Sequence, residues 1–230
     1  MAKKVSDLQY AESKHQYTNP ANGERYPSVT AIVGSFDSGD KLGAGAAAAV
    51  NLWKKGQNHR EVWKAKADLG TRIHGYAELW MDGRPAEVPE GEGPYMDAFA
   101  QFCDDYHPRW IEVERAVISA FGYGGRFDMI GELDLWDGPK YVLCDIKSGK
   151  KYSAEVTLQL AGYRYADGMI LYDDKGMAVG LEPMPHIDEC AGLYLHDDGT
   201  YDLAIVQADL VAHSHLVDLL MLKLWAKEQG

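Results

Sequence analysis

Cysteine is scarce in this sequence. Only Cys103, Cys144 and Cys190 occur among 230 residues, and no two of them form a Cys-x-x-Cys pair. An odd number of widely spaced cysteines argues against a disulfide framework and against a zinc site built from cysteines. We therefore expect neither.

Long apolar runs are missing as well. No stretch approaches the roughly 20 apolar residues that a membrane-spanning helix needs. The N-terminal residues, Met-Ala-Lys-Lys-Val-Ser-Asp, lack the apolar centre of a secretory signal peptide. We therefore expect a cytoplasmic protein with no membrane partner.

The sequence also lacks internal repeats, low-complexity segments and linkers, so nothing divides the chain. Its 230 residues, 46% of them hydrophobic, suffice for one domain with a sizeable core. We predict a single domain over 1–230. It has a mainly helical part at 1–110, a strand–hairpin–helix core at 111–170, and a hairpin with a closing helix at 171–230.

The order of predicted elements indicates the fold class. Residue patterns predict helices at 42–55, 59–81, 95–106 and 208–227, a strand at 111–121, a hairpin over 191–206 and irregular chain at 175–189. This order predicts an α/β fold in which helices flank a mixed sheet.

Positive charge is in deficit. The formal net charge is -12, whereas nucleic-acid-binding proteins usually carry a basic surface. The charge is uneven, however, because seven basic residues between Lys41 and Arg72 stand against two acidic ones. This basic stretch is either a solvated helix face or an arch or channel for single-stranded DNA. Within it, Trp53 either packs on the core, which we expect, or stacks on a base.

The most informative segment is the run from Tyr141 to Lys150. It begins with apolar residues, and these are followed by Asp145, Ile146 and Lys147. Read as a strand, it places Asp145 and Lys147 on one face and Ile146 on the other. An acid and an amine leaving a core strand together are costly unless they are paired or used. They therefore form either a salt bridge at a strand end or part of a catalytic site.

A preceding hairpin supplies a second carboxylate. Asp137-Gly138 is a strong turn signal. If these residues form a two-residue turn, Asp128 lies opposite Lys147, with Asp145 diagonally adjacent on the same face. We therefore choose Asp128 as the partner of Asp145.

Asp134 is the rival carboxylate on the same strand. The predicted register places it beside Tyr141, roughly 13 Å along the strand from the level of Asp145. A longer loop or a bulge would move the register by a residue or two. Asp134 therefore stays an auxiliary candidate.

Two carboxylates beside a lysine suit the hydrolysis of a phosphate ester. Hard oxygen ligands bind Mg²⁺ or Mn²⁺. Such an ion polarises a phosphoryl oxygen and lowers the pKa of a bound water. Lys147 would orient that water or stabilise the charge that develops on the phosphate.

A helix is predicted to follow the strand. Ser153 is a good N-cap with Glu155 in the first turn. Gln159 and Tyr163 are four residues apart and share one helix face. That face either packs in the ordinary amphipathic way or lies over the end of Asp145-Ile146-Lys147.

Together these motifs resemble the RecB-like branch of the PD-(D/E)XK nucleases. The resemblance runs from about Tyr26 to Tyr163, and the segment that begins at Tyr26 is similar to the opening of the mitochondrial genome maintenance exonuclease and of phage exonucleases. Each motif alone is weak, but four in order at sensible spacing are fairly specific. They are Gly125-Arg126-Phe127-Asp128, Asp145-Ile146-Lys147 followed by Ser-Gly, Gln159 with Tyr163, and His74 on an earlier helix.

The resemblance implies a restriction-endonuclease-like core and roles for individual residues. Metal ligands would be His74, Asp128, Asp145 and the Ile146 carbonyl. Catalytic residues would be Asp128, Asp145 and Lys147, while Gln159 and Tyr163 would hold the scissile strand. Glu114 is an auxiliary candidate, and Glu78 is either a surface charge or a residue that orients His74.

The implied activity is that of a Mg²⁺- or Mn²⁺-dependent DNA exonuclease. Its partners would be single-stranded DNA or duplex ends and a replication or recombination protein. It would act in phage or bacterial DNA replication, recombination or repair, in the bacterial cytoplasm. Some members of this family hold an iron–sulfur cluster through four cysteines, and with three cysteines we predict none.

Two other function classes compete. One is a non-catalytic DNA-binding or protein-interaction module that keeps the nuclease fold. The other is a metal-dependent hydrolase of a different phosphate ester, although no Gly-rich phosphate loop supports a nucleotide-binding version.

Overall fold

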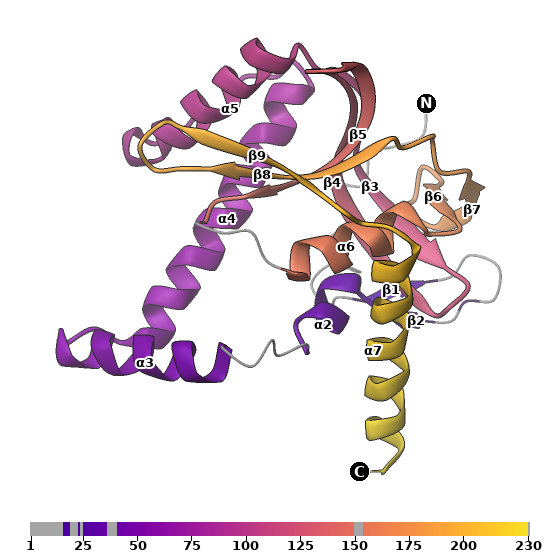
Figure 1. The fold of residues 1–230 in the computed structure, drawn as a ribbon, viewed down its shortest axis with the longest axis horizontal. Coiled ribbons are helices and arrows are strands. Elements are labelled where there is room, and N and C mark those ends of the chain that lie inside the picture. Colours follow the sequence, from indigo (N-terminus) through magenta and orange to yellow (C-terminus); the bar gives the residue numbers. More distant parts are fainter. Residues whose placement is uncertain (1–15, 19–22, 24, 36–40, 150–153, 230) are drawn as a thin grey trace.

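A seven-stranded sheet forms the centre of the computed structural model, which describes residues 16–18, 23, 25–35, 41–149 and 154–229 (Figure 1). The strand order is β7-β6-β3-β4-β5-β8-β9. Only the β5–β8 pair is parallel, so the sheet is mixed. The strands are β3 Arg109–Ser119, β4 Tyr123–Leu135, β5 Gly138–Lys147, β6 Gly168–Tyr172, β7 Ala178–Glu182, β8 Glu189–Leu195 and β9 Tyr201–Val206.

Helices lie on both faces of this sheet, which confirms the predicted α/β class (Figure 1). A small second sheet pairs β1 Gln16–Thr18 with β2 Arg25–Pro27. In the described part of the chain, no helix is both long and apolar enough to cross a membrane. The helices are α2 Val29–Val33, α3 Lys41–Lys54, α4 His59–Met81, the 3-10 helix η2 Glu90–Glu92, α5 Gly93–Tyr106, α6 Ala154–Arg164 and α7 Leu210–Gln229.

Side-chain caps explain where two of the helices start. The Ser28 hydroxyl accepts a hydrogen bond from the Ala31 amide at 3.0 Å and starts α2. The Asn58 side chain accepts one from the Arg60 amide at 3.0 Å and starts α4. Each bond satisfies an amide that the helix itself leaves unpaired. The predicted cap at Ser153 lies outside the described residues.

The two faces of the sheet carry separate apolar cores. Val142, Cys144 and Ile146 of β5 pack in the core that includes α4 and α5. Leu143 packs in the core that includes α2, α6 and α7. Because side chains alternate along a strand, Asp145 and Lys147 share the α6 face with Leu143. The predicted alternation is therefore confirmed.

The β4–β5 hairpin turns one residue earlier than predicted. Leu135 pairs with Gly138, so Trp136 and Asp137 form the turn. Gly138 takes a φ of +113°, which only glycine adopts readily, and it opens the strand instead of sitting in the turn. The register therefore moves by two residues.

This shift corrects the predicted pairing. Asp134 lies opposite Pro139 and not Tyr141. Met129 pairs with Cys144, and the next residues in that register are Asp128 and Asp145, so Asp128 does not lie opposite Lys147. A shift of two keeps every side chain on its expected face, because the side-chain period of a strand is two.

Part of the sheet was not predicted. β6 and β7 form one end of it, and β7 lies within the 175–189 segment expected to be irregular. Glycine and proline in that segment suggested a loop, but β7 is an edge strand that ends just before Pro183. Edge strands tolerate these residues because only one side of the strand is paired.

Packing around Gly125 gives a first testable prediction. A Cβ at Gly125 would lie 2.3 Å from Cε1 of Tyr163 and 3.3 Å from Cγ2 of Val29. Tyr163 and Val29 are both buried, so neither can move aside easily. We expect Gly125→Ala to lower the free energy of unfolding by about 1–3 kcal/mol, measured by urea denaturation.

Gly75→Ala on α4 is the matched control, because a Cβ there meets nothing within 4 Å. Alanine is the better helix former, so stability should hold or rise by up to about 1 kcal/mol. Equal losses in the two variants would contradict the packing argument.

Candidate active site

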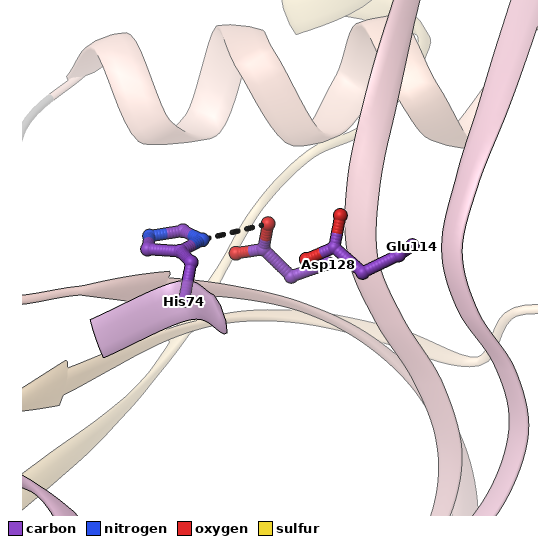
Figure 2. A group of neighbouring side chains, drawn as sticks. All are labelled: His74, Glu114 and Asp128. Atoms are coloured by element: carbon purple, nitrogen blue, oxygen red, sulfur yellow. Dashed lines mark hydrogen bonds and ion pairs between the residues drawn. The ribbon is translucent and has the colours of Figure 1, made fainter. Parts of the chain in front are cut away.

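His74, Glu114 and Asp128 each bring one potential ligand atom to a common position. These three atoms lie within 4.8 Å of one another. Figure 2 shows the three side chains together, with the His74 ring joined to Asp128 by an interaction of 3.1 Å between Nδ1 and Oδ1. They come from α4, β3 and β4, so tertiary folding builds the cluster.

Strand pairing places Glu114 beside Asp128. Val113 pairs with Met129 and Arg115 with Phe127, so the residues between them face each other. Glu114 has a φ of +52°, a conformation that residues other than glycine rarely adopt. Such backbone strain costs roughly 1–3 kcal/mol and tends to cluster at functional sites. It is an independent reason to regard Glu114 as a site residue.

Arg126 ties this cluster to Glu78. Its guanidinium forms an ion pair with Glu114, and Nη2 lies 3.7 Å from the Glu78 carboxylate. Glu78 is therefore neither a free surface charge nor a partner of His74. Glu78 contacts the cluster indirectly, through Arg126, which is also the ion-pair partner of Glu114.

A second polar group lies next to the cluster, around Asp145. Lys147 Nζ is 2.5 Å from one carboxylate oxygen of Asp145. Gln159 Nε2 donates to the other oxygen at 2.7 Å and lies 3.0 Å from the Tyr163 hydroxyl. Lys147 also donates to Gln159 Oε1 at 3.3 Å. Both oxygens of Asp145, which is only 2% exposed, are thereby engaged.

One hydrogen bond joins the two groups. The Ile146 amide donates to Asp128 Oδ2 at 2.6 Å, while the other oxygen of Asp128 faces His74. The backbone of β5 thus holds Asp128 beside Asp145. The Ile146 amide thus contributes to the site through Asp128, while the role of its carbonyl as a metal ligand stays a prediction.

The structure brings together part of the predicted ligand set. His74 and Asp128 lie together as expected, but the third member of the cluster is Glu114. Asp145 is turned toward Lys147 and Gln159 instead. Glu114 was only an auxiliary candidate in the sequence analysis, because the sequence does not specify how β3 and β4 pair.

Asp134 lies away from the site. It is exposed, and its carboxylate is 3.7 Å from His107. Its partner Pro139 is six residues along β5 from Asp145, or roughly 20 Å. Asp134 is therefore excluded as an alternative to Asp128.

Tyr163 is buried within the protein. It is 1% exposed, and its hydroxyl contacts Gln159. Gln159 is 8% exposed and holds Asp145. Gln159 thus contacts both members of the Asp145–Lys147 pair, and Tyr163 contacts Gln159 from inside the protein. A direct contact of Tyr163 with a DNA strand would require a different arrangement.

Mutual charge effects are strong here. Burial would lower the pKa of His74, but Asp128 beside it raises that pKa to about 9. Burial, reinforced by Asp128, raises the pKa of Glu114 to about 8 although Arg126 opposes this. Burial also disfavours the Lys147 ammonium, yet Asp145 and Asp128 hold its pKa above the usual value. Lys147 therefore stays charged.

The donor set fits a divalent cation. Two buried carboxylates that repel each other are stabilised by a bound cation. Metal–oxygen bonds of about 2.1 Å place opposite ligands about 4 Å apart, which agrees with the 4.8 Å limit of this cluster. Oxygen ligands suit Mg²⁺ and Mn²⁺, and the imidazole favours Mn²⁺.

A cavity of about 890 Å³ opens beside the Asp145 group. Lys147 and Gln159 line one side of it, and Lys66 of α4 lines another. His196 and Asp197, which follow β8, also contribute. A substrate in this cavity would meet Lys147 directly.

Comparison with known proteins adds no assignment. The chain matches no model of a known protein family, and it has no significant match among curated proteins. The case for function therefore depends on the residues and their geometry.

Metal binding provides the second prediction. Wild-type protein should bind Mn²⁺, and Asp128→Asn should weaken binding at least tenfold, because the variant loses a charged ligand at the centre of the cluster. The Asn side chain still accepts a hydrogen bond from the Ile146 amide, so the fold should persist. Isothermal titration calorimetry measures the affinity.

Asp134→Asn is the control, since it removes the same charge from the same strand outside the cluster. Its Mn²⁺ affinity should equal that of the wild type. Similar losses in both variants, or no binding by the wild type, would contradict the assignment.

Proposed function

We propose that this protein is a metal-dependent nuclease that hydrolyses phosphodiester bonds in DNA. The observation that carries the proposal is a cluster of potential cation ligands joined directly to a buried acid–lysine pair. The cluster is His74, Glu114 and Asp128, the pair is Asp145 and Lys147, and the Asp128–Ile146 hydrogen bond connects them.

The proposal includes a restriction-endonuclease-like core. In support, the candidate acids lie on a hairpin of a mixed sheet, and α6 follows directly with Gln159 over the strand end. The sequence motifs occupy these elements in the order that the resembled family uses. Exonuclease action and a role in cytoplasmic phage or bacterial DNA replication, recombination or repair rest on that resemblance alone.

The residues divide the chemistry among them. A divalent ion held by His74, Glu114 and Asp128 would polarise the phosphoryl oxygen and acidify a water. Lys147, held as an ammonium by Asp145, faces the cavity and would orient that water or neutralise charge on the phosphate. Hydrolysis by in-line attack leaves a 5′-phosphate in the resembled enzymes.

A non-catalytic module is the less economical alternative. A module that only binds would gain little from burying a charged acid–lysine pair next to two crowded carboxylates, since each buried charge is costly. Metal-dependent cleavage separates these classes. Competition by DNA separates a nuclease from a hydrolase of another phosphate ester.

The third prediction concerns cleavage. End-labelled linear DNA, single- and double-stranded, should be hydrolysed with Mg²⁺ or Mn²⁺ but not with EDTA. Lys147→Ala and Asp145→Ala should each reduce the rate at least about a hundredfold, because each removes charge from the reacting centre. The position of the label in the products gives polarity and distinguishes exonuclease from endonuclease action.

Asp134→Asn serves as the control and should cleave at the wild-type rate. Lack of cleavage with either metal would overturn the nuclease assignment. Cleavage that survives in both site variants would place the active site elsewhere.

The fourth prediction separates positioning from metal binding. Gln159→Ala removes the donor to Asp145, and hydrogen bonds to charged groups contribute about 1.5–3 kcal/mol. We expect kcat to fall roughly tenfold to a hundredfold while the Mn²⁺ affinity stays unchanged, because Gln159 is outside the cluster. A matched loss of Mn²⁺ affinity would show that Gln159 acts through the metal ligands instead.

A further inference from the structure

Two tryptophans are exposed on α3 and on the first half of α4. Trp53 of α3 is 76% exposed and Trp63 of α4 is 46% exposed. The expectation that Trp53 packs on the core is therefore wrong. Figure 1 shows α3 and the adjoining end of α4 extending away from the central sheet. We call residues 53–66 of these helices the α3–α4 arm.

The α3–α4 arm is basic although the protein is acidic. It contains five basic residues and one acidic residue in a chain with a net charge of -12. All five basic side chains are exposed, so their charge faces solvent. They are Lys54, Lys55, Arg60, Lys64 and Lys66.

One face of α4 connects the arm to the candidate active site. Trp63, Ala67, Gly70 and His74 follow at intervals of four, three and four residues, which is the spacing of one helix face. Ala67 lines the cavity that contains Lys147. A Cβ at Gly70 would lie 3.4 Å from the Ser148 hydroxyl, so Gly70 lies against the residue that follows Lys147.

The distances along this face are short. With a rise of 1.5 Å per residue, Trp63 lies about 16 Å from His74 along α4. Lys66, between them, lines the same cavity. An extended strand that runs from Trp63 past Lys66 would therefore enter the cavity that Lys147 lines.

We propose that the α3–α4 arm binds single-stranded DNA, with bases stacked on Trp53 and Trp63 and phosphates on the basic side chains, and directs that strand along α4 to the active site. The choice of DNA as the ligand rests on the proposed function. Single strands are favoured because their bases offer free faces to an indole, whereas the faces in a duplex are already stacked. Charge alone would attract both forms.

Fluorescence anisotropy with EDTA present tests the proposal without cleavage. The probes are a labelled oligothymidine of about 20 nucleotides, longer than one binding site, and a duplex of equal length. Wild-type protein should bind the single strand more tightly. The double variant Trp53→Ala/Trp63→Ala should bind it about tenfold or more weakly, since each stacked base contributes substantially.

Trp136→Ala is the matched control. Trp136 is 84% exposed in the β4–β5 turn, at the end of the hairpin remote from Asp145. Its single-strand affinity should equal that of the wild type. Trp53→Phe/Trp63→Phe should keep part of the affinity, because phenylalanine also stacks.

Three results would overturn the proposal: equal affinity for the two probes, equal affinity of wild type and double variant, or an equal loss in Trp136→Ala. A cleavage assay on the same variants keeps the two proposals apart. If binding depends on the tryptophans but the wild-type protein does not cleave DNA, the nuclease proposal is wrong and the proposal for the α3–α4 arm stands. If the tryptophan variants keep the wild-type cleavage rate and single-strand affinity, the proposal for the α3–α4 arm is wrong and the nuclease proposal stands.

Discussion

The two hydrogen bonds of Asp128 determine the arrangement of the whole site. One oxygen faces the His74 ring and the other accepts from the Ile146 amide. A buried carboxylate needs such partners to stay ionised, and the charge of His74 lowers the pKa of Asp128 against the effect of burial. Since the second donor is a backbone amide of β5, the carboxylate is fixed to the strand that carries Asp145 and Lys147. The geometry of the His74–Glu114–Asp128 cluster and that of the acid–lysine pair are thus set together.

The sheet faces could be predicted from the sequence more reliably than the sheet register. The alternation around Asp145-Ile146-Lys147 specified which side chains share a face, and a two-residue error in the turn left that result intact. The same error put Lys147, and not Asp145, directly opposite Asp128. An Asp-Gly pair is compatible with a turn that includes Gly138 and with a turn that ends before it, so the sequence left the turn position open.

Glu114 shows why the rest of the site was beyond the sequence. Its position opposite Asp128 depends on the β3–β4 register, which is shifted by an irregularity between Trp110 and Glu112. No periodic pattern specifies such a bulge. The left-handed backbone of Glu114 likewise comes from the assembled sheet, since glutamate does not favour that conformation. Helix spacing put Gln159 on one face with Tyr163 and the family resemblance made it a site residue, but its contact with Asp145 became apparent only in the structure.

Negative and positive side chains are concentrated in different regions of the protein. The centre concentrates buried carboxylates, which would repel a polyanion unless a cation were bound among them. The α3–α4 arm concentrates exposed basic side chains at the far end of the same helix that provides His74. A strand held by the arm alone would stop short of the acidic centre, whereas a bound cation would reverse the local sign and let the phosphate approach Lys147. Metal occupancy and strand binding would therefore be coupled through electrostatics, and this coupling would allow a chain with a net charge of -12 to act on DNA as proposed.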